Sequence, residues 1–156
     1  GQLAELAGGA LELLWNREGS NPLTVRLTLP AIEQASVLIV DDNADTLRLF
    51  ERYLSDTSYA YAGSSDPQQA LALALELKPR VIVLDVMLPG MDGWELLGRL
   101  RADPDSGHIP VIVCSILPEK QLALGAAAYL RKPVSRADFL EAVGRQVSRG
   151  DPESSA

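Results

Sequence analysis

The apolar positions of the chain gather into short runs, separated by longer amphipathic stretches. The runs at residues 37–40, 81–84 and 110–114 are continuous and rich in β-branched residues, which is typical of strands buried on both faces of a parallel sheet. A shorter run at residues 128–130 predicts a further strand of this kind, and residues 58–62 predict a strand at the sheet edge. Five such strands are enough to form one central sheet.

Helical patterns lie between these strands. Asn43 is a helix-capping residue type, and Asp66 followed by Pro67 predicts a second helix start. Residues 94–101 predict a third helix, and Ser135 begins the last one. Strand and helix alternate five times, so right-handed crossovers predict a doubly wound α/β fold, a five-stranded parallel sheet with helices on both faces. The inner faces of the first and last helices are predicted to carry Leu47, Phe50, Leu54, Phe139, Val143 and Val147.

The first 35 residues follow a different pattern. Residues 2–7 have helix-forming composition and stop at two glycines, so they predict a short helix. Residues 10–15 and 23–29, the second of which alternates cleanly between apolar and polar positions, predict a β-hairpin. An isolated hairpin is marginally stable in water, so its apolar face needs a neighbour to pack on. That face includes Leu13, Trp15, Val25 and Leu27.

Polar side chains stand where four of the predicted strands end. Asp41 and Asp42 follow the first strand, Asp85 follows the third, Ser115 ends the fourth and Lys132 follows the last. In open parallel sheets the carboxyl ends of the strands line the ligand-binding crevice, so these groups should meet at one edge. Three carboxylates repel one another unless a cation neutralises them, and hard oxygen ligands suit Mg²⁺, or Mn²⁺ in its place.

Each of these residues taken alone has a plain structural role. An acid after a strand commonly caps a turn or helix, a serine there is commonly a strand-end hydroxyl, and a lysine is commonly a solvated surface charge. The order of all five along the chain, each at a strand end, favours a shared functional site instead.

The composition limits the class of protein. With 156 residues, of which 47% are hydrophobic and 22% charged, the chain suits one globular domain with an additional segment. No apolar run approaches the length of a membrane span and no signal peptide is recognisable, so we expect a cytoplasmic protein without membrane contact. The net charge of −7 argues against nucleic acid as a partner. The single cysteine, Cys114, falls in a predicted strand and is interpreted as a core residue.

Four motifs occur in the order VLIVDDN, VIVLDVMLPGMDGWELL, PVIVCS and YLRKP. Together they resemble the receiver domain of two-component response regulators over residues 36–148. The resemblance implies a flavodoxin-like fold with strand order 2-1-3-4-5, and transfer of a phosphoryl group from a phosphohistidine to Asp85. In this family pattern Lys132 supplies a cation and Ser115 a hydroxyl to the phosphoryl oxygens.

The same resemblance assigns a metal site and a switch. Ser115 and Tyr129 are implied as the pair that responds to phosphorylation, and a cis peptide bond is implied between Lys132 and Pro133. The residues assigned to Mg²⁺ are Asp42 and Asp85 by direct contact, Asp41 through water and Met87 through its backbone carbonyl.

Residues 1–30 are similar to the last helix and terminal hairpin of the histidine-kinase ATP-binding domain. The string that carries this likeness is LAELAGGALELLWNREGSNPLTVRLTLP. The chain is accordingly divided into this remnant, a linker at 31–36, the receiver at 37–148 and a disordered tail at 149–156. The glycine-rich nucleotide boxes of the kinase domain are absent, so we expect no ATP binding and no reaction beyond the chain's own phosphorylation. A hybrid sensor kinase is implied as the parent protein.

The partners implied by these resemblances are signalling proteins. They are the phosphohistidine domain of a histidine kinase, in the same polypeptide or another, a phosphotransfer domain and a second copy of the chain. The only histidine, His108, lies in a predicted exposed loop that offers no helix face to a kinase. The donor histidine must therefore come from elsewhere.

Two features depart from the family pattern. Sixteen residues separate Ser115 from Lys132, about one helical turn fewer than usual, so a fourth helix within residues 118–124 should be short. Ile116 stands where the family usually has a small residue, and it should crowd the site. No polar group at the flanking positions can orient a hydrolytic water, so we expect slow loss of the acyl phosphate; these positions are Met87 and Leu117.

Two other functions stay open at this point. A receiver-like adaptor would keep the fold and act through protein contacts without phosphorylation, which Ile116 and the short fourth helix favour. A metal-dependent phosphatase would also place acids, a lysine and a hydroxyl at a sheet edge. Its usual motif separates two acids by one residue, whereas Asp41 and Asp42 are adjacent. Titration with a divalent metal separates the adaptor from the phosphoacceptor.

Overall fold

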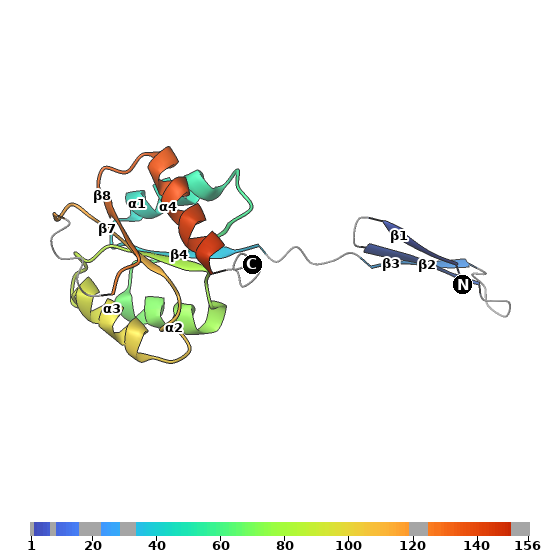
Figure 1. Cartoon of the computed structure of the whole chain (residues 1–156), viewed down its shortest axis with the longest axis horizontal. Helices are drawn as coiled ribbons and strands as arrows, with labels where there is room; N and C mark the ends of the chain where they lie inside the picture. The colour runs from blue at the N-terminus through green and yellow to red at the C-terminus, as the bar shows by residue number, and fades with distance from the viewer. Residues whose placement is uncertain (1, 7–8, 16–22, 29–33, 119–124, 151–156) are drawn as a thin grey trace. The chain divides into compact units, whose positions relative to one another are not determined.

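The chain divides into two compact units, residues 1–33 and residues 34–156 (Figure 1). No helix in the described part of the chain is long and apolar enough to cross a lipid bilayer. The residues that the computed structural model describes are 2–6, 9–15, 23–28, 34–118 and 125–150.

The N-terminal unit is a three-stranded antiparallel sheet. Strand β1 (Gln2–Leu6) pairs with β2 (Gly9–Trp15), which pairs in turn with β3 (Leu23–Thr28). The predicted hairpin is confirmed, but the helix predicted for residues 2–7 is wrong, because Gln2–Leu6 is a strand. A helix this short is unstable alone, whereas the free edge of β2 offers hydrogen-bond partners to an extended segment.

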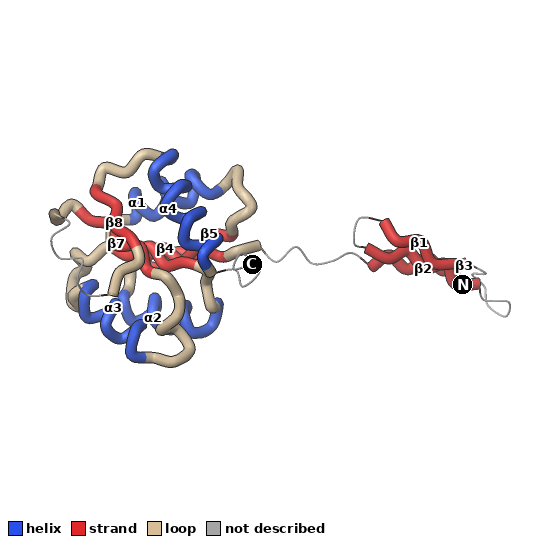
Figure 2. The backbone as a smooth tube through the Cα atoms, viewed as in Figure 1, coloured by secondary structure: helices blue, strands red, loops and turns tan. Residues whose placement is uncertain are grey.

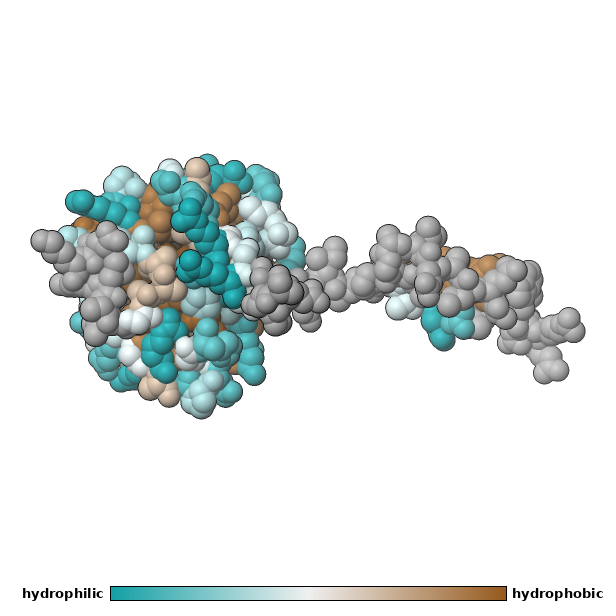
Figure 3. Space-filling model, in the orientation of Figure 1, coloured by the Kyte–Doolittle hydropathy of each residue, from teal (hydrophilic) through white to brown (hydrophobic). Residues whose placement is uncertain are grey.

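This small sheet has an apolar and a polar face. The register sets Leu13 opposite Val25, and it sets Glu12 opposite Arg26, where the two charged side chains form an ion pair at 3.3 Å. Val25 and Leu27 keep 54% and 60% of their surface exposed, and apolar surface is visible on this unit in Figure 3. Among the described residues of this unit, Val25 and Leu27 of the predicted apolar face therefore stay largely uncovered.

The C-terminal unit is the predicted doubly wound α/β fold. Its five strands are parallel in the order β5-β4-β6-β7-β8, which is the predicted order 2-1-3-4-5. Helices α1 and α4 cover one face of the sheet, and α2 and α3 cover the other (Figure 2). The elements are β4 (Ser36–Val40), α1 (Ala44–Leu54), β5 (Ala60–Ser64), α2 (Pro67–Leu77), β6 (Val81–Leu84), α3 (Gly93–Ala102), β7 (Val111–Ser115), β8 (Ala128–Arg131) and α4 (Arg136–Arg149).

Two apolar layers hold this unit together. Successive side chains of a strand point to opposite faces, so Leu38 of β4 packs with α2 and α3, and its neighbour Val37 packs with α1 and α4. On the second face, the rings of Phe50 and Phe139 stack with their centroids 4.6 Å apart. Each fully buried side chain of this size stabilises the fold by roughly 1.5–3 kcal/mol. The central strands, and therefore their ends, are held on both sides.

Helices α1, α2 and α4 begin at the predicted caps, whereas the cap of α3, Asp92, was not predicted. Asn43, Asp66 and Ser135 each accept hydrogen bonds from backbone N–H groups in the first turn of the following helix. Pro67 takes the first position of α2, where its missing N–H costs nothing. The short-range capping pattern therefore predicted these helix starts.

The edge strand has different bounds from those predicted. Several other predicted features fall on residues that the structure does not describe. Strand β5 spans Ala60–Ser64 instead of residues 58–62, because it pairs with β4 up to the pair of Val40 and Ser64. The remaining predicted features lie outside the described residues: most of the fourth helix (119–124), part of the linker (31–33), the end of the tail (151–156) and the side chain of Trp15.

Gly93, the first residue of α3, packs closely against the backbone near the sheet edge. A Cβ built on it would lie 2.3 Å from Cα of Val86 and 2.7 Å from the carbonyl oxygen of Asp85. We expect Gly93→Ala to lower the free energy of unfolding by about 2 kcal/mol, because backbone atoms must move. Gly98→Ala on the same helix meets nothing within 4 Å and should raise stability by up to about 1 kcal/mol. Urea unfolding measures both, and equal effects would contradict this packing argument.

Candidate functional site

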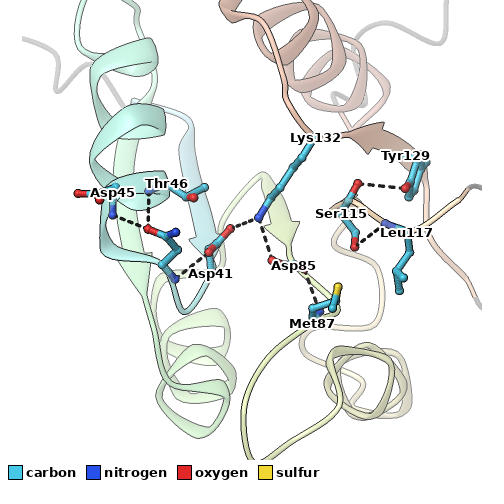
Figure 4. A network of polar contacts seen from close by, with 10 residues as sticks. Asp41, Asp45, Thr46, Asp85, Met87, Ser115, Leu117, Tyr129 and Lys132 are labelled. Carbon is cyan, nitrogen blue, oxygen red and sulfur yellow. Dashed lines mark hydrogen bonds and ion pairs between the residues drawn. The ribbon is translucent and has the colours of Figure 1, made fainter.

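Residues from four strands meet at the carboxyl edge of the sheet. Asp41 follows β4, Asp85 follows β6, Ser115 ends β7 and Lys132 follows β8. Figure 4 shows Lys132 reaching from the end of β8 to a point between Asp41 and Asp85. The fold thus brings together groups that are far apart in the sequence.

Three carboxylates form the acidic part of the site. One oxygen from each of Asp41, Asp42 and Asp85 lies within 4.8 Å of the others. Asp41 and Asp85 keep only 2% and 7% of their surface exposed, whereas Asp42 is exposed to solvent. Like charges this close destabilise one another at a buried position unless a positive charge stands beside them.

Lys132 supplies a positive charge. Its Nζ donates hydrogen bonds to Oδ2 of Asp41 at 2.6 Å and to Oδ2 of Asp85 at 2.8 Å. Burial lowers the pKa of the ammonium group, but the hydrogen bonds and charges of the two carboxylates together outweigh burial, so the pKa is raised. Lys132 is therefore protonated at neutral pH. Three formal negative charges and one positive charge leave the site with two negative charges.

Backbone N–H groups fix the orientation of two acids. The N–H of Asn43 donates to Oδ1 of Asp41, and the N–H of Met87 donates to Oδ1 of Asp85, both at 2.8 Å. Each acid therefore uses one oxygen for an N–H two residues ahead and its other oxygen for Lys132. The contact of Asn43 with Asp41 was not predicted from the sequence, although an N–H two residues after an aspartate is a known turn signal.

Ser115 and Tyr129 form a separate contact next to the acids. Ser115 is fully buried, and its Oγ accepts a hydrogen bond from the N–H of Leu117 at 3.3 Å. The hydroxyl of Tyr129 donates to the backbone carbonyl of Ser115 at 3.1 Å (Figure 4). The structure therefore places the predicted switch residues in contact, while their roles stay predictions.

Apolar side chains stand at the rim of the site. Ile116 keeps 61% of its surface exposed and Met87 keeps 48%. The contact that fixes Met87 is made by its N–H, and the metal-binding role of its carbonyl stays a prediction. The expected absence of a polar side chain at Met87 and Leu117 is a property of the sequence itself.

Three smaller expectations can be compared with the structure. The peptide bond between Lys132 and Pro133 is cis, as the resemblance implies. His108 is exposed in the loop before β7. Cys114 is buried in β7, and burial, more than the nearby charges, raises the pKa of its thiol to about 12. Its interpretation as a core residue is therefore confirmed.

The donor set of the acids suits a hard divalent cation. Carboxylate oxygens are the ligands that Mg²⁺ and Mn²⁺ prefer, and two excess negative charges match one such ion. Asp42 is exposed, so water can complete the coordination from the solvent side. Within the described residues, these three acids are the group that can hold a metal ion.

The fold and the site together define a class of signalling domain. A five-stranded parallel sheet of order 2-1-3-4-5 carries an acid cluster, a lysine and a serine at its carboxyl edge, as receiver domains do. The chain belongs to the response regulator receiver domain family, whose sequence pattern matches residues 37–144. Its cluster of Asp41, Asp42 and Asp85 is consistent with phosphoacceptor function.

Named relatives agree with this assignment. The chain is 38% identical over 105 residues to the response regulator PleD of Caulobacter vibrioides, which covers 64% of this chain and 23% of PleD. It therefore spans about a quarter of the length of that relative.

Two solved structures are similar as well. The receiver domain of the sensor histidine kinase PA1611 from Pseudomonas aeruginosa PAO1 has 26% identity and a TM-score of 0.67, covers 72% of this chain and is itself covered to 97%. That structure holds a magnesium ion in its active site cleft. The receiver domain of a signal transduction histidine kinase from Syntrophus aciditrophicus has 28% identity and a TM-score of 0.70, covers 78% of this chain and is itself covered to 96%.

Removing the ammonium group tests how far the acids depend on it. We expect Lys132→Met to lower the free energy of unfolding by about 3 kcal/mol, because the buried carboxylates of Asp41 and Asp85 lose their counter-charge. Arg99→Met, which breaks an exposed ion pair with Glu95, should cost less than about 1 kcal/mol. Added Mg²⁺ should restore more stability to Lys132→Met than to the unaltered chain. Thermal unfolding measures these differences, and equal losses in both variants would refute the argument.

Proposed function

We propose that this chain accepts a phosphoryl group from a phosphohistidine onto Asp85, with bound Mg²⁺, in a two-component phosphorelay. One observation carries the proposal: the nearly buried carboxylate of Asp85 is held by Lys132 and lies within 4.8 Å of the ligand oxygens of Asp41 and Asp42. Such a site concentrates the parts that phosphoryl transfer needs, which are an oxygen nucleophile, a cation and a metal site.

The side chains have distinct proposed roles. An oxygen of Asp85 forms a bond to phosphorus while the bond between phosphorus and the donor histidine nitrogen breaks, which leaves an acyl phosphate. Lys132 keeps a positive charge beside the phosphoryl oxygens, and Ser115 offers its hydroxyl. Bound Mg²⁺, or Mn²⁺, supplies further positive charge to these oxygens. Its proposed ligands are Asp42 and Asp85 directly, Asp41 through water and the backbone carbonyl of Met87.

Ser115 and Tyr129 are proposed as the switch that reports phosphorylation. The ring of Tyr129 is tied to the end of β7 by its hydrogen bond to the Ser115 carbonyl. If Ser115 moves as a whole toward a phosphoryl group, its backbone carbonyl moves too, and this contact changes with it. The switch would thus carry the state of the site to strand β8.

The parent protein is proposed to be a hybrid histidine kinase, with this chain in the cytoplasm. Two similar solved structures are receiver domains of histidine kinases, and a separate small sheet precedes the receiver unit here. The proposed division is a kinase remnant at 1–30, a linker at 31–36, the receiver at 37–148 and a tail at 149–156; the structure moves two of these boundaries by one residue, because Ser36 belongs to β4 and Arg149 to α4. The donor is then the phosphohistidine domain of a kinase, and a phosphotransfer domain or a second copy of the chain are further proposed partners.

An apolar groove beside the acids supports docking of the donor domain. It has a volume of about 430 Å³ and adjoins the site through Lys132, so a helix seated in it would bring a histidine close to Asp85. Its lining residues are Thr46, Leu49, Phe50, Tyr53, Ile116, Lys132, Pro133 and Val134.

A receiver-like adaptor is the second candidate function. The exposed Ile116 at the rim favours it, because an apolar side chain in that place serves protein contacts better than it serves access of a phosphoryl group. An adaptor of this kind needs no metal, so absence of Mg²⁺ binding at millimolar concentrations would favour it over the phosphoacceptor.

Labelling with a small phosphodonor tests the phosphoacceptor assignment. In the presence of Mg²⁺ the unaltered chain should take up one phosphoryl group, and Asp85→Asn should lose this label because the amide cannot form the acyl phosphate. Asp66→Asn, an acid-to-amide change that keeps the cap of α2, should retain it. Intact-protein mass spectrometry measures the added mass, and a label that survives Asp85→Asn would exclude this assignment.

The lifetime of the acyl phosphate tests the role of the apolar rim. We expect the label to persist for many minutes, because Met87 and Leu117 offer no group that can orient an attacking water. Met87→Asn should shorten the lifetime several-fold, whereas Met87→Leu, which adds no polar group, should leave it unchanged. Release of inorganic phosphate measures the rate; loss within seconds from the unaltered chain would contradict this expectation.

A further inference from the structure

Asn43 makes contacts in two directions. Its side-chain Oδ1 accepts hydrogen bonds from the N–H groups of Asp45 and Thr46, at 2.9 Å and 3.3 Å, in the first turn of α1. Its carbonyl accepts the N–H of Leu47 at 3.1 Å. Its own N–H points the other way and donates to Oδ1 of Asp41 at 2.8 Å. One residue thus joins a helix end to a site carboxylate.

We propose that Asn43 is a positioning residue that fixes the first turn of α1 and the carboxylate of Asp41 as one unit. The proposal rests on the proposed function in one respect, namely that the acids bind a divalent cation. It adds a residue outside the assigned ligands whose side chain decides how well they are oriented.

The physical reason lies in the backbone of residue 43. The cap holds Asn43 in an extended conformation, φ −86° and ψ 112°, and this conformation directs its N–H at Asp41. Without the side chain, the first turn of α1 loses the acceptor for two N–H groups and frays. Asp41 is 2% exposed, so water cannot readily replace the lost restraint, and among the described residues Lys132 alone then holds the carboxylate.

The coupling is reciprocal. If capping α1 orients Asp41, then a cation that orders Asp41 must also stabilise the cap by the same free energy. Helix α1 carries four residues of the groove that is proposed to bind the donor domain. A cation that orders Asp41 therefore also stabilises this surface through the first turn of α1. The groove residues on α1 are Thr46, Leu49, Phe50 and Tyr53.

The chain contains a matched control at α2. Asp66 caps this helix, which like α1 has 11 residues, through hydrogen bonds of 2.7 Å and 3.2 Å from Gln68 and Gln69. Its own N–H, however, donates to the hydroxyl of Ser64 and not to a site acid. Loss of the Asp66 cap should therefore destabilise the fold without changing the orientation of Asp41.

Metal affinity gives the first test. Mn²⁺ binding to the full chain, measured by calorimetry, should weaken about fivefold in Asn43→Ala, the factor that loss of one cap corresponds to. Asn43→Ser keeps a capping oxygen and should restore the affinity. Asp66→Ala should lose similar thermal stability and keep its affinity. Unchanged affinity in Asn43→Ala, or an equal loss in Asp66→Ala, would overturn the proposal.

Amide exchange without metal gives the second test. Asp41→Ala should speed exchange of the Asn43, Asp45 and Thr46 amides, measured by NMR, while the Gln68 amide in the first turn of α2 is unaffected. Unaltered exchange at Asp45 and Thr46 would overturn the proposal even where metal binds. This exchange experiment needs neither a cation nor a phosphodonor. It therefore distinguishes failure of the proposed link between Asn43 and Asp41 from failure of the phosphoacceptor assignment.

Discussion

The structure depends on the contact between one ammonium group and two nearly buried carboxylates. Asp41 and Asp85 stand on neighbouring strands of the sheet, and Lys132 bridges them from the far edge strand. Without this charge, two acids in an apolar sheet edge would destabilise the fold. Even with the charge of Lys132, the cluster of Asp41, Asp42 and Asp85 carries excess negative charge. This excess charge favours binding of a cation.

The parallel sheet makes this arrangement possible. All five strands end at the same edge, where β4, β6, β7 and β8 supply the site residues, and the two apolar layers hold those strand ends in place. Backbone N–H groups two residues past Asp41 and Asp85 then fix the carboxylates. The close packing of Gly93 against the loop after β6 also helps to position Asp85, since any side chain at residue 93 would displace the backbone of Asp85.

The interior of the site is charged and polar, whereas its rim is apolar. Inside, charge and hydrogen bonding suit acceptance of a phosphoryl group on Asp85. At the rim, Ile116 and Met87 present exposed apolar surface, which suits contact with a partner and does little to bring in water. The receiver thus combines an acidic interior that is consistent with phosphoacceptor function with a rim of exposed apolar side chains. The small N-terminal sheet, with Val25 and Leu27 exposed, is a separate unit.

The sequence by itself determined the strands, the helix starts at Asn43 and Asp66, and the strand-end positions of the site residues, because these follow from periodicity and capping between near neighbours. It failed at residues 2–6, where pairing with β2 overrides helical composition. Only the tertiary structure decided which oxygens Lys132 contacts, across 91 and 47 residues, since no local pattern encodes such partners. It also decided that Asn43 holds Asp41, because a backbone N–H acquires its direction only when the helix after it is folded.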